Sequence, residues 1–160
     1  MGLDALSNVL WKERELLDTL LFKLEVEELI IAHGRTRWLG RAAHDVERVL
    51  DHMRELEVGR AVEATDAASL LGLGADASLL EIAGAAPEPW NDMMHSHHLA
   101  LTTVTAQIDA LSHANHALLE QTLRATREAL VGIEAAAGEY DPTGTPRGSD
   151  GGALLLDQDI

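Results

Sequence analysis

The chain has 160 residues and a formal charge of −15, and 46% of its residues are hydrophobic but only 3% aromatic. A core built mostly from Leu, Ala, Ile and Val favours helices over strands, so we expect one compact all-α domain. The negative charge argues against binding to nucleic acid or anionic membranes, because both need clustered Lys and Arg. The absence of cysteine excludes disulfides, thiolate catalysis and cysteine-ligated zinc.

The charge is unevenly distributed along the chain. Residues 1–60 carry nine basic and twelve acidic side chains, whereas residues 61–123 carry eight acidic and no basic ones. No apolar run approaches the ~20 residues that a membrane-spanning helix needs, and the N-terminus lacks a basic segment followed by an apolar one. We therefore expect a cytoplasmic protein that does not insert into a membrane.

A first long helix is predicted over residues 3–33, where leucine and isoleucine recur three and four residues apart. Glu13 and Glu27 occupy two core-facing positions of this repeat. The helical rise separates them by ~21 Å, which is too far for shared acid-base chemistry. We interpret them as positions at the edge of the core that pair with arginines.

A tight turn and a second helix over residues 36–59 are predicted next. Gly34 is suited to a left-handed C-terminal cap, and Thr36 to an N-cap, so the second helix would fold back antiparallel to the first. Residues 61–89 are rich in Ala, Gly and Ser, and we expect a connector with two short helical pieces within residues 64–84. Pro87 and Pro89 then separate this connector from the next helix.

The longest helix is predicted over residues 90–137. Its core-facing positions are spaced alternately four and three apart, at Trp90, Met94, His97, Leu101, Val104, Ile108, Leu111, Asn115 and Leu118. An amide at such a position loses solvation unless it finds a partner, so Asn115 is expected to cost stability and to set register or partner choice.

Beyond Leu118 the apolar stripe is displaced by one residue and continues through Leu119, Leu123, Leu130 and Ile133. One residue is ~100° around a helix, so the two halves present apolar surface in different directions. The first half is expected to face the other helices and the second half another molecule. We expect a helical domain over residues 1–140 and a flexible tail over residues 141–160, which is rich in Gly, Asp and Ser.

Histidines three residues apart, His95 with His98 and His113 with His116, could each place two imidazoles on one metal. No carboxylate cluster accompanies either pair, and the sequence has no catalytic triad context and no glycine-rich phosphate loop. We therefore predict no metal, no cofactor and no enzyme activity. A helical metal enzyme that uses the histidines is the alternative that this prediction sets aside.

Several segments, in order along the chain, resemble the flagellar export chaperones of the FlgN family, especially their high-GC Gram-positive branch. These segments are Trp11–Leu17, Leu21–Glu25, Gly34–Leu39, Ser78–Ala83, Ala86–Trp90, Asn115–Leu119 and Tyr140–Gly144. The resemblance implies an all-helical cytoplasmic chaperone without ATPase activity. It would bind the hook-filament junction proteins FlgK and FlgL, keep their terminal helices from assembling, and deliver them to the flagellar type III export gate.

The resemblance also implies where the partners bind. The family's client-binding surface lies in the C-terminal helix, and a tyrosine just after that helix is tied to the export gate, which here points to Tyr140. Together with the apolar stripe, this predicts a client-binding site formed by Leu111, Asn115, Leu118, Leu119, Leu123, Leu130 and Ile133. The alternative is a structural coiled-coil scaffold that pairs with itself as a homodimer and has no flagellar client.

Overall fold

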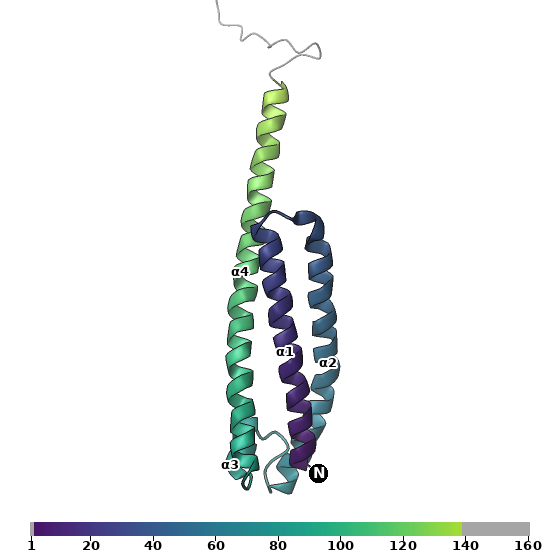
Figure 1. Ribbon diagram of the computed structural model, residues 1–160, viewed down its shortest axis with the longest axis vertical. Coiled ribbons are helices and arrows are strands. Elements are labelled where there is room, and N and C mark those ends of the chain that lie inside the picture. Colours follow the sequence, from purple (N-terminus) through teal and green to yellow (C-terminus); the bar gives the residue numbers. More distant parts are fainter. Residues whose placement is uncertain (1, 139–160) are drawn as a thin grey trace, which may run out of the picture. The chain divides into compact units, whose positions relative to one another are not determined.

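The computed structural model describes residues 2–138, and every regular element in this range is helical (Figure 1). The all-α fold class is therefore confirmed. The predicted tail over residues 141–160, and Tyr140, lie outside the described residues. The elements in chain order are α1 (Gly2–Ala32), the short 3₁₀ helix η1 (Thr36–Trp38), α2 (Leu39–Leu70), α3 (Leu79–Ala85) and α4 (Trp90–Gly138).

The chain divides into two units, Met1–Leu119 and a second that begins at Glu120. The first unit is a bundle in which α1 lies between α2 and the first part of α4 (Figure 1). The described part of the second unit is the remainder of α4, residues 120–138.

The core of the bundle is made by the predicted three-four repeats. In α1 the buried repeat runs through Leu6, Leu10, Leu17, Leu20, Leu24 and Ile31, and in α4 through Met94, His97, Leu101, Val104, Ile108 and Asn115. Burying one such aliphatic side chain contributes about 1.5–3 kcal/mol, so these two rows supply much of the stability of the bundle. The long helices form because their apolar positions face one another.

Gly34 turns the chain between α1 and α2 as predicted. Its φ of 64° is left-handed, and its N–H donates to Ile31 O at 3.1 Å while the Arg35 N–H donates to Ile30 O at 3.0 Å. These two bonds satisfy carbonyls that the helix end would leave free, in the pattern of a Schellman cap. The prediction that Thr36 is the N-cap of the second helix was wrong. Thr36 is the first residue of η1, and α2 begins at Leu39 without a side-chain cap.

The second helix ends at Leu70, eleven residues later than predicted, and so includes the first of the two short pieces expected in the connector. Gly59 does not interrupt it, although glycine costs a helix interior about 0.5–1 kcal/mol. The reason lies further along, where Ala67 and Ala68 are fully buried in the bundle core. This packing outweighs the local propensity, and α2 stops only at Gly72, whose φ is 72°.

The second expected short piece is present as α3. Its N-cap is Ser78, whose side chain accepts from the Glu81 N–H at 3.3 Å while the Ser78 N–H donates to Glu81 Oε2 at 2.7 Å. This reciprocal capping box lets a helix of seven residues start at a defined position. Ile82 and Ala83 are fully buried, and α3 contacts α2 at the end of the bundle where α4 begins.

Candidate functional site

The residues predicted to bind a client all lie on α4, but they divide between the two units. Leu111 is half-buried and packs against the bundle core, and Leu118 and Leu119 are also half-buried. Leu123, Leu130 and Ile133 belong to the second unit and are exposed. Some of the predicted residues are therefore inside the bundle, and the others are on the exposed surface of residues 120–138.

Asn115 lies in the bundle, with only 2% of its surface exposed. Its Nδ2 donates to the Leu24 carbonyl oxygen at 2.9 Å and to Glu27 Oε1 at 3.4 Å, both on α1. Its Oδ1 is buried without a hydrogen-bond partner. The side chain faces α1, so its amide links α4 to α1 within the bundle, and a direct client contact by Asn115 stays a prediction.

The second unit presents three large aliphatic side chains on one face of a helix. Leu123, Leu130 and Ile133 are 48%, 55% and 65% exposed, and their spacings of seven and three residues place them within one stripe. Val131 is also 65% exposed, but it lies ~100° around the helix from Leu130 and outside the stripe. Exposed aliphatic side chains aligned in this way are a feature of surfaces that bind other proteins.

A buried polar cluster joins α1 and α4 near the other end of the bundle. The Ser7 hydroxyl lies 3.1 Å from His97 Nε2 and donates to Met93 Sδ at 3.3 Å, while the Trp11 ring meets the His97 ring edge-on at 5.0 Å. The direction of the Ser7–His97 hydrogen bond depends on the tautomer of the ring, and His97 Nδ1 is buried without a hydrogen-bond partner. Burial, and then the Arg14 guanidinium, lower the pKa of His97 below its ordinary value, so the ring is neutral at pH 7.

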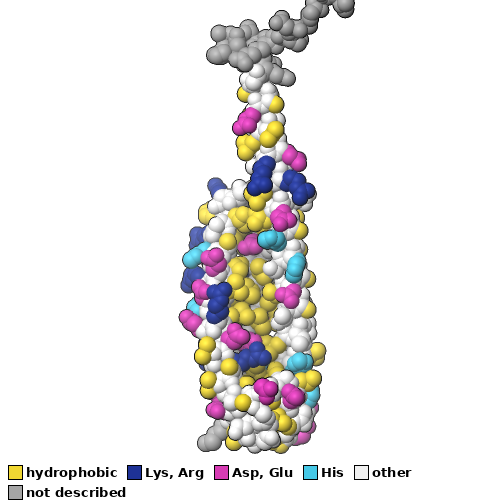
Figure 2. All heavy atoms as spheres, turned by 180° about the vertical axis from the view of Figure 1, so that it is seen from behind, with side chains coloured by type: hydrophobic (Ala, Val, Ile, Leu, Met, Phe, Trp, Pro, Cys, Tyr) yellow, Lys and Arg dark blue, Asp and Glu magenta, His cyan; other side chains and the backbone are white. Residues whose placement is uncertain are grey.

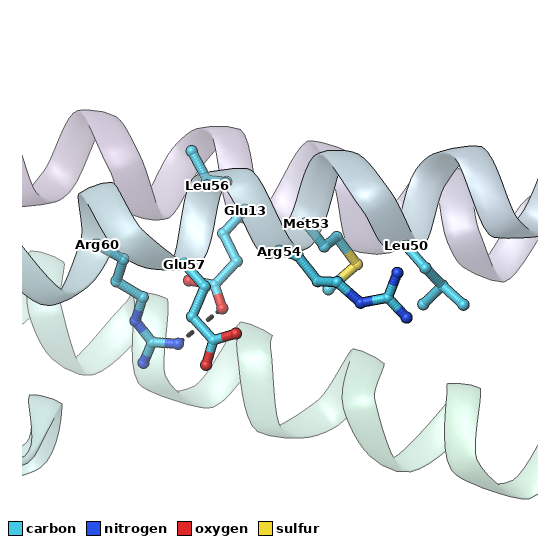
Figure 3. A pocket seen from close by; sticks show the side chains of 7 residues that line it. All are labelled: Glu13, Leu50, Met53, Arg54, Leu56, Glu57 and Arg60. Atoms are coloured by element: carbon cyan, nitrogen blue, oxygen red, sulfur yellow. Dashed lines mark hydrogen bonds and ion pairs between the residues drawn. The ribbon is translucent and has the colours of Figure 1, made fainter.

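A second polar group in the bundle is Glu13, which is half-buried and whose predicted pairing with an arginine is confirmed. Arg60 Nη1 donates to Glu13 Oε1 at 2.8 Å across the space between α1 and α2 (Figure 3). Glu13 Oε2 is buried without a partner. Burial is the largest influence and raises the pKa of Glu13 above its ordinary value, although Arg60 lowers it, and Glu57 adds a smaller upward contribution. The carboxylate is thus incompletely compensated.

One histidine of each pair named in the sequence bonds to the backbone of its own helix. His95 Nδ1 is 2.9 Å from Asn91 O and His113 Nδ1 is 2.7 Å from Asp109 O, so each ring engages its own helix. Within residues 2–138, no three His, Asp or Glu side chains converge as a metal site would require. None of the helices in that range combines the length and apolar character needed to cross a bilayer.

A helical bundle that continues into a helix with an exposed aliphatic stripe is an arrangement suited to proteins that bind amphipathic segments of other proteins. The chain belongs to the FlgN family, because the model of that family, described as FlgN protein, matches residues 1–148. No curated protein and no solved structure matches the chain. Membership in this family implies, in general terms, a flagellar export chaperone for hook-associated proteins, and the family is not known for enzyme activity.

Proposed function

We propose that this protein binds the hook-filament junction proteins FlgK and FlgL in the cytoplasm, keeps their terminal helices from assembling, and delivers them to the export gate. Family membership supports the general role. The observation that carries the client-binding step is the stripe of Leu123, Leu130 and Ile133, which no other part of the described chain covers.

The stripe suits an amphipathic helix of an incompletely folded client. Such a helix would lay its own apolar face against the three side chains and remove both faces from water. Since each of the three is about half exposed, covering them contributes about 1–1.5 kcal/mol each, or about 4 kcal/mol in total. That corresponds to a dissociation constant of ~1 mM before the costs of association, so a client held tightly must use further surface of the chaperone.

Tyr140 completes the proposal as the residue that contacts the export gate. It is the only tyrosine in the sequence and stands two positions after Gly138, the last residue of α4, although it lies outside the described residues. Its replacement should leave client binding unchanged and reduce export of FlgK and FlgL, which secretion assays can separate from binding assays.

A matched pair of substitutions tests the client-binding step. Ile133→Asp places a charge in the stripe, while Val131→Asp places the same charge at a position that is equally exposed, at 65%, but outside it. We expect Ile133→Asp to weaken capture of FlgK and FlgL about tenfold, and Val131→Asp to have little effect. Equal capture by both variants would contradict the proposal.

Truncation after Leu118 should also abolish capture while circular dichroism still reports folded α1 and α2. A stable homodimer by sedimentation, combined with no capture of FlgK or FlgL by the intact chain, would instead support the structural scaffold.

A further inference from the structure

The face of the bundle opposite to that in Figure 1 carries an apolar trough. Figure 2 shows hydrophobic side chains gathered along the middle of this face, between α2 and α4. Its walls include Leu50, Met53 and Glu57 from α2, and Leu101, Ala106 and Asp109 from α4. The Glu13–Arg60 ion pair lines both of the hollows that make it up, of about 280 and 610 Å³, so the hollows adjoin.

The dimensions of the trough match a helix. Its α2 wall runs ten residues from Leu50 to Arg60, or ~15 Å, and its α4 wall runs eleven residues from His98 to Asp109, or ~16 Å. This is the length of about three helical turns. Three long helices that leave such an open apolar face lack the fourth member that would complete a four-helix bundle.

The charges of the trough specify the kind of helix. Its two arginines are already engaged, Arg54 with Asp51 and Arg60 with Glu13. In contrast, Glu57 and Asp109 on opposite walls form no ion pair within residues 2–138. Residues 61–123 contain no Lys or Arg that could neutralise the α4 wall. The uncompensated charge at the rims of the trough is therefore negative.

We propose that this trough is a second docking surface, which takes a basic amphipathic helix of the exported client. The helix would place aliphatic side chains at positions i, i+4 and i+7 between α2 and α4, and Lys or Arg on both flanks near Glu57 and Asp109. The assignment of this helix to an exported client rests on the proposed chaperone function. Occupation of the trough would supply apolar contact area that the stripe of the second unit lacks.

The test uses the full-length chain and a synthetic helical peptide with Leu at i, i+4 and i+7 and Lys at the flanking positions. Calorimetry should show binding that is about tenfold tighter than for the same peptide with Glu in place of Lys, and a preference that shrinks as salt is raised. The double variant Glu57→Lys with Asp109→Lys should reverse the preference. Equal binding of the two peptides by the wild-type chain would overturn the inference.

A second pair of variants tests the location. Ala106→Trp fills the trough, whereas Ala110→Trp places the same ring one turn further along α4 at an exposed position that does not line it. Only Ala106→Trp should lose the peptide, with circular dichroism unchanged in both. Undiminished binding by Ala106→Trp, or a wild-type dimer that this variant makes monomeric, would overturn the inference.

Capture of FlgK and FlgL separates this inference from the proposed function. Loss of capture in both Ala106→Trp and Ile133→Asp supports the trough as a client surface. Loss in Ile133→Asp alone overturns the trough and leaves the proposed function standing. If the wild-type chain captures neither protein but still binds the Lys peptide at the trough, the docking surface is supported and the proposed function fails.

Discussion

Replacing Asn115 by aspartate is expected to destabilise the bundle strongly, although the two side chains have nearly the same shape. The change removes the Nδ2 donor that bonds the Leu24 carbonyl oxygen at 2.9 Å and turns two acceptors toward each other. It also places a carboxylate that is 2% exposed beside Glu27, whose Oε1 lies 3.4 Å from the present amide nitrogen.

The expected loss follows from these contacts. A hydrogen bond contributes about 1 kcal/mol, and an uncompensated buried charge costs several more, so the total is about 3–5 kcal/mol at pH 7. For a chain of this size that corresponds to a drop in Tm of roughly 10 °C. Urea unfolding followed by circular dichroism measures the free energy directly.

The loss of stability caused by Asn115→Asp should depend on pH. Burial and Glu27 should raise the pKa of the introduced carboxyl above its unfolded value. The loss in the free energy of unfolding should therefore grow as pH rises and become smaller toward pH 4. Asn8→Asp adds the same charge at an exposed position of α1 and should change the stability by less than about 0.5 kcal/mol. A loss at Asn115 no larger than this control would refute the assignment of the amide as a buried donor.

Three further predictions concern single groups. Because burial, and then Arg14, lower the folded-state pKa of His97, wild-type stability should fall as pH drops below 6.5, and His97→Gln should flatten this dependence in thermal melts between pH 7.5 and 5.5. Because the folded-state pKa of Glu13 is raised, the contribution of this group to the free energy of unfolding is full below pH 4.5 and declines as pH rises. Glu13→Gln should remove that decline. An unchanged dependence of stability on pH, measured by urea titrations, would contradict this prediction. Gly59→Ala should stabilise the protein by about 0.5–1 kcal/mol, since its Cβ would meet nothing within 4 Å, whereas Gly72→Ala, at a φ of 72°, should destabilise it.

Core-facing positions could be predicted from the sequence because they depend on spacing within one helix. The repeat from Met94 to Ile108 is buried as expected, since a three-four spacing of aliphatic side chains has only one stable orientation in a bundle. The predicted end of α2 was wrong because the position at which this helix ends depends on contacts across the bundle. Ala67 and Ala68 look like connector residues locally, and only their packing in the core keeps them helical.

In the candidate site, too, features set by spacing within one helix could be predicted, whereas features set by contacts between helices could not. The stripe at Leu123, Leu130 and Ile133 was predictable from spacing and composition, although its use by a client is a proposal. The burial of Asn115 against Leu24, and the trough shared by Glu57 and Asp109, depend on which helices are neighbours and at what height. A single sequence indicates an unusual residue at such a place but not the partner that surrounds it.

The exposure of residues 120–138 has a thermodynamic consequence. Apart from Thr122, which is half-buried, every side chain of this segment is exposed, so its helix gains little from tertiary burial. An isolated helix of this length in water is held by propensity alone and melts by a gradual helix–coil transition rather than with the bundle. Its amides should therefore exchange with deuterium far sooner than those of α1, and a client that covers the stripe should slow that exchange while adding to the helical circular dichroism. Part of the binding free energy would then be used to order the chaperone itself.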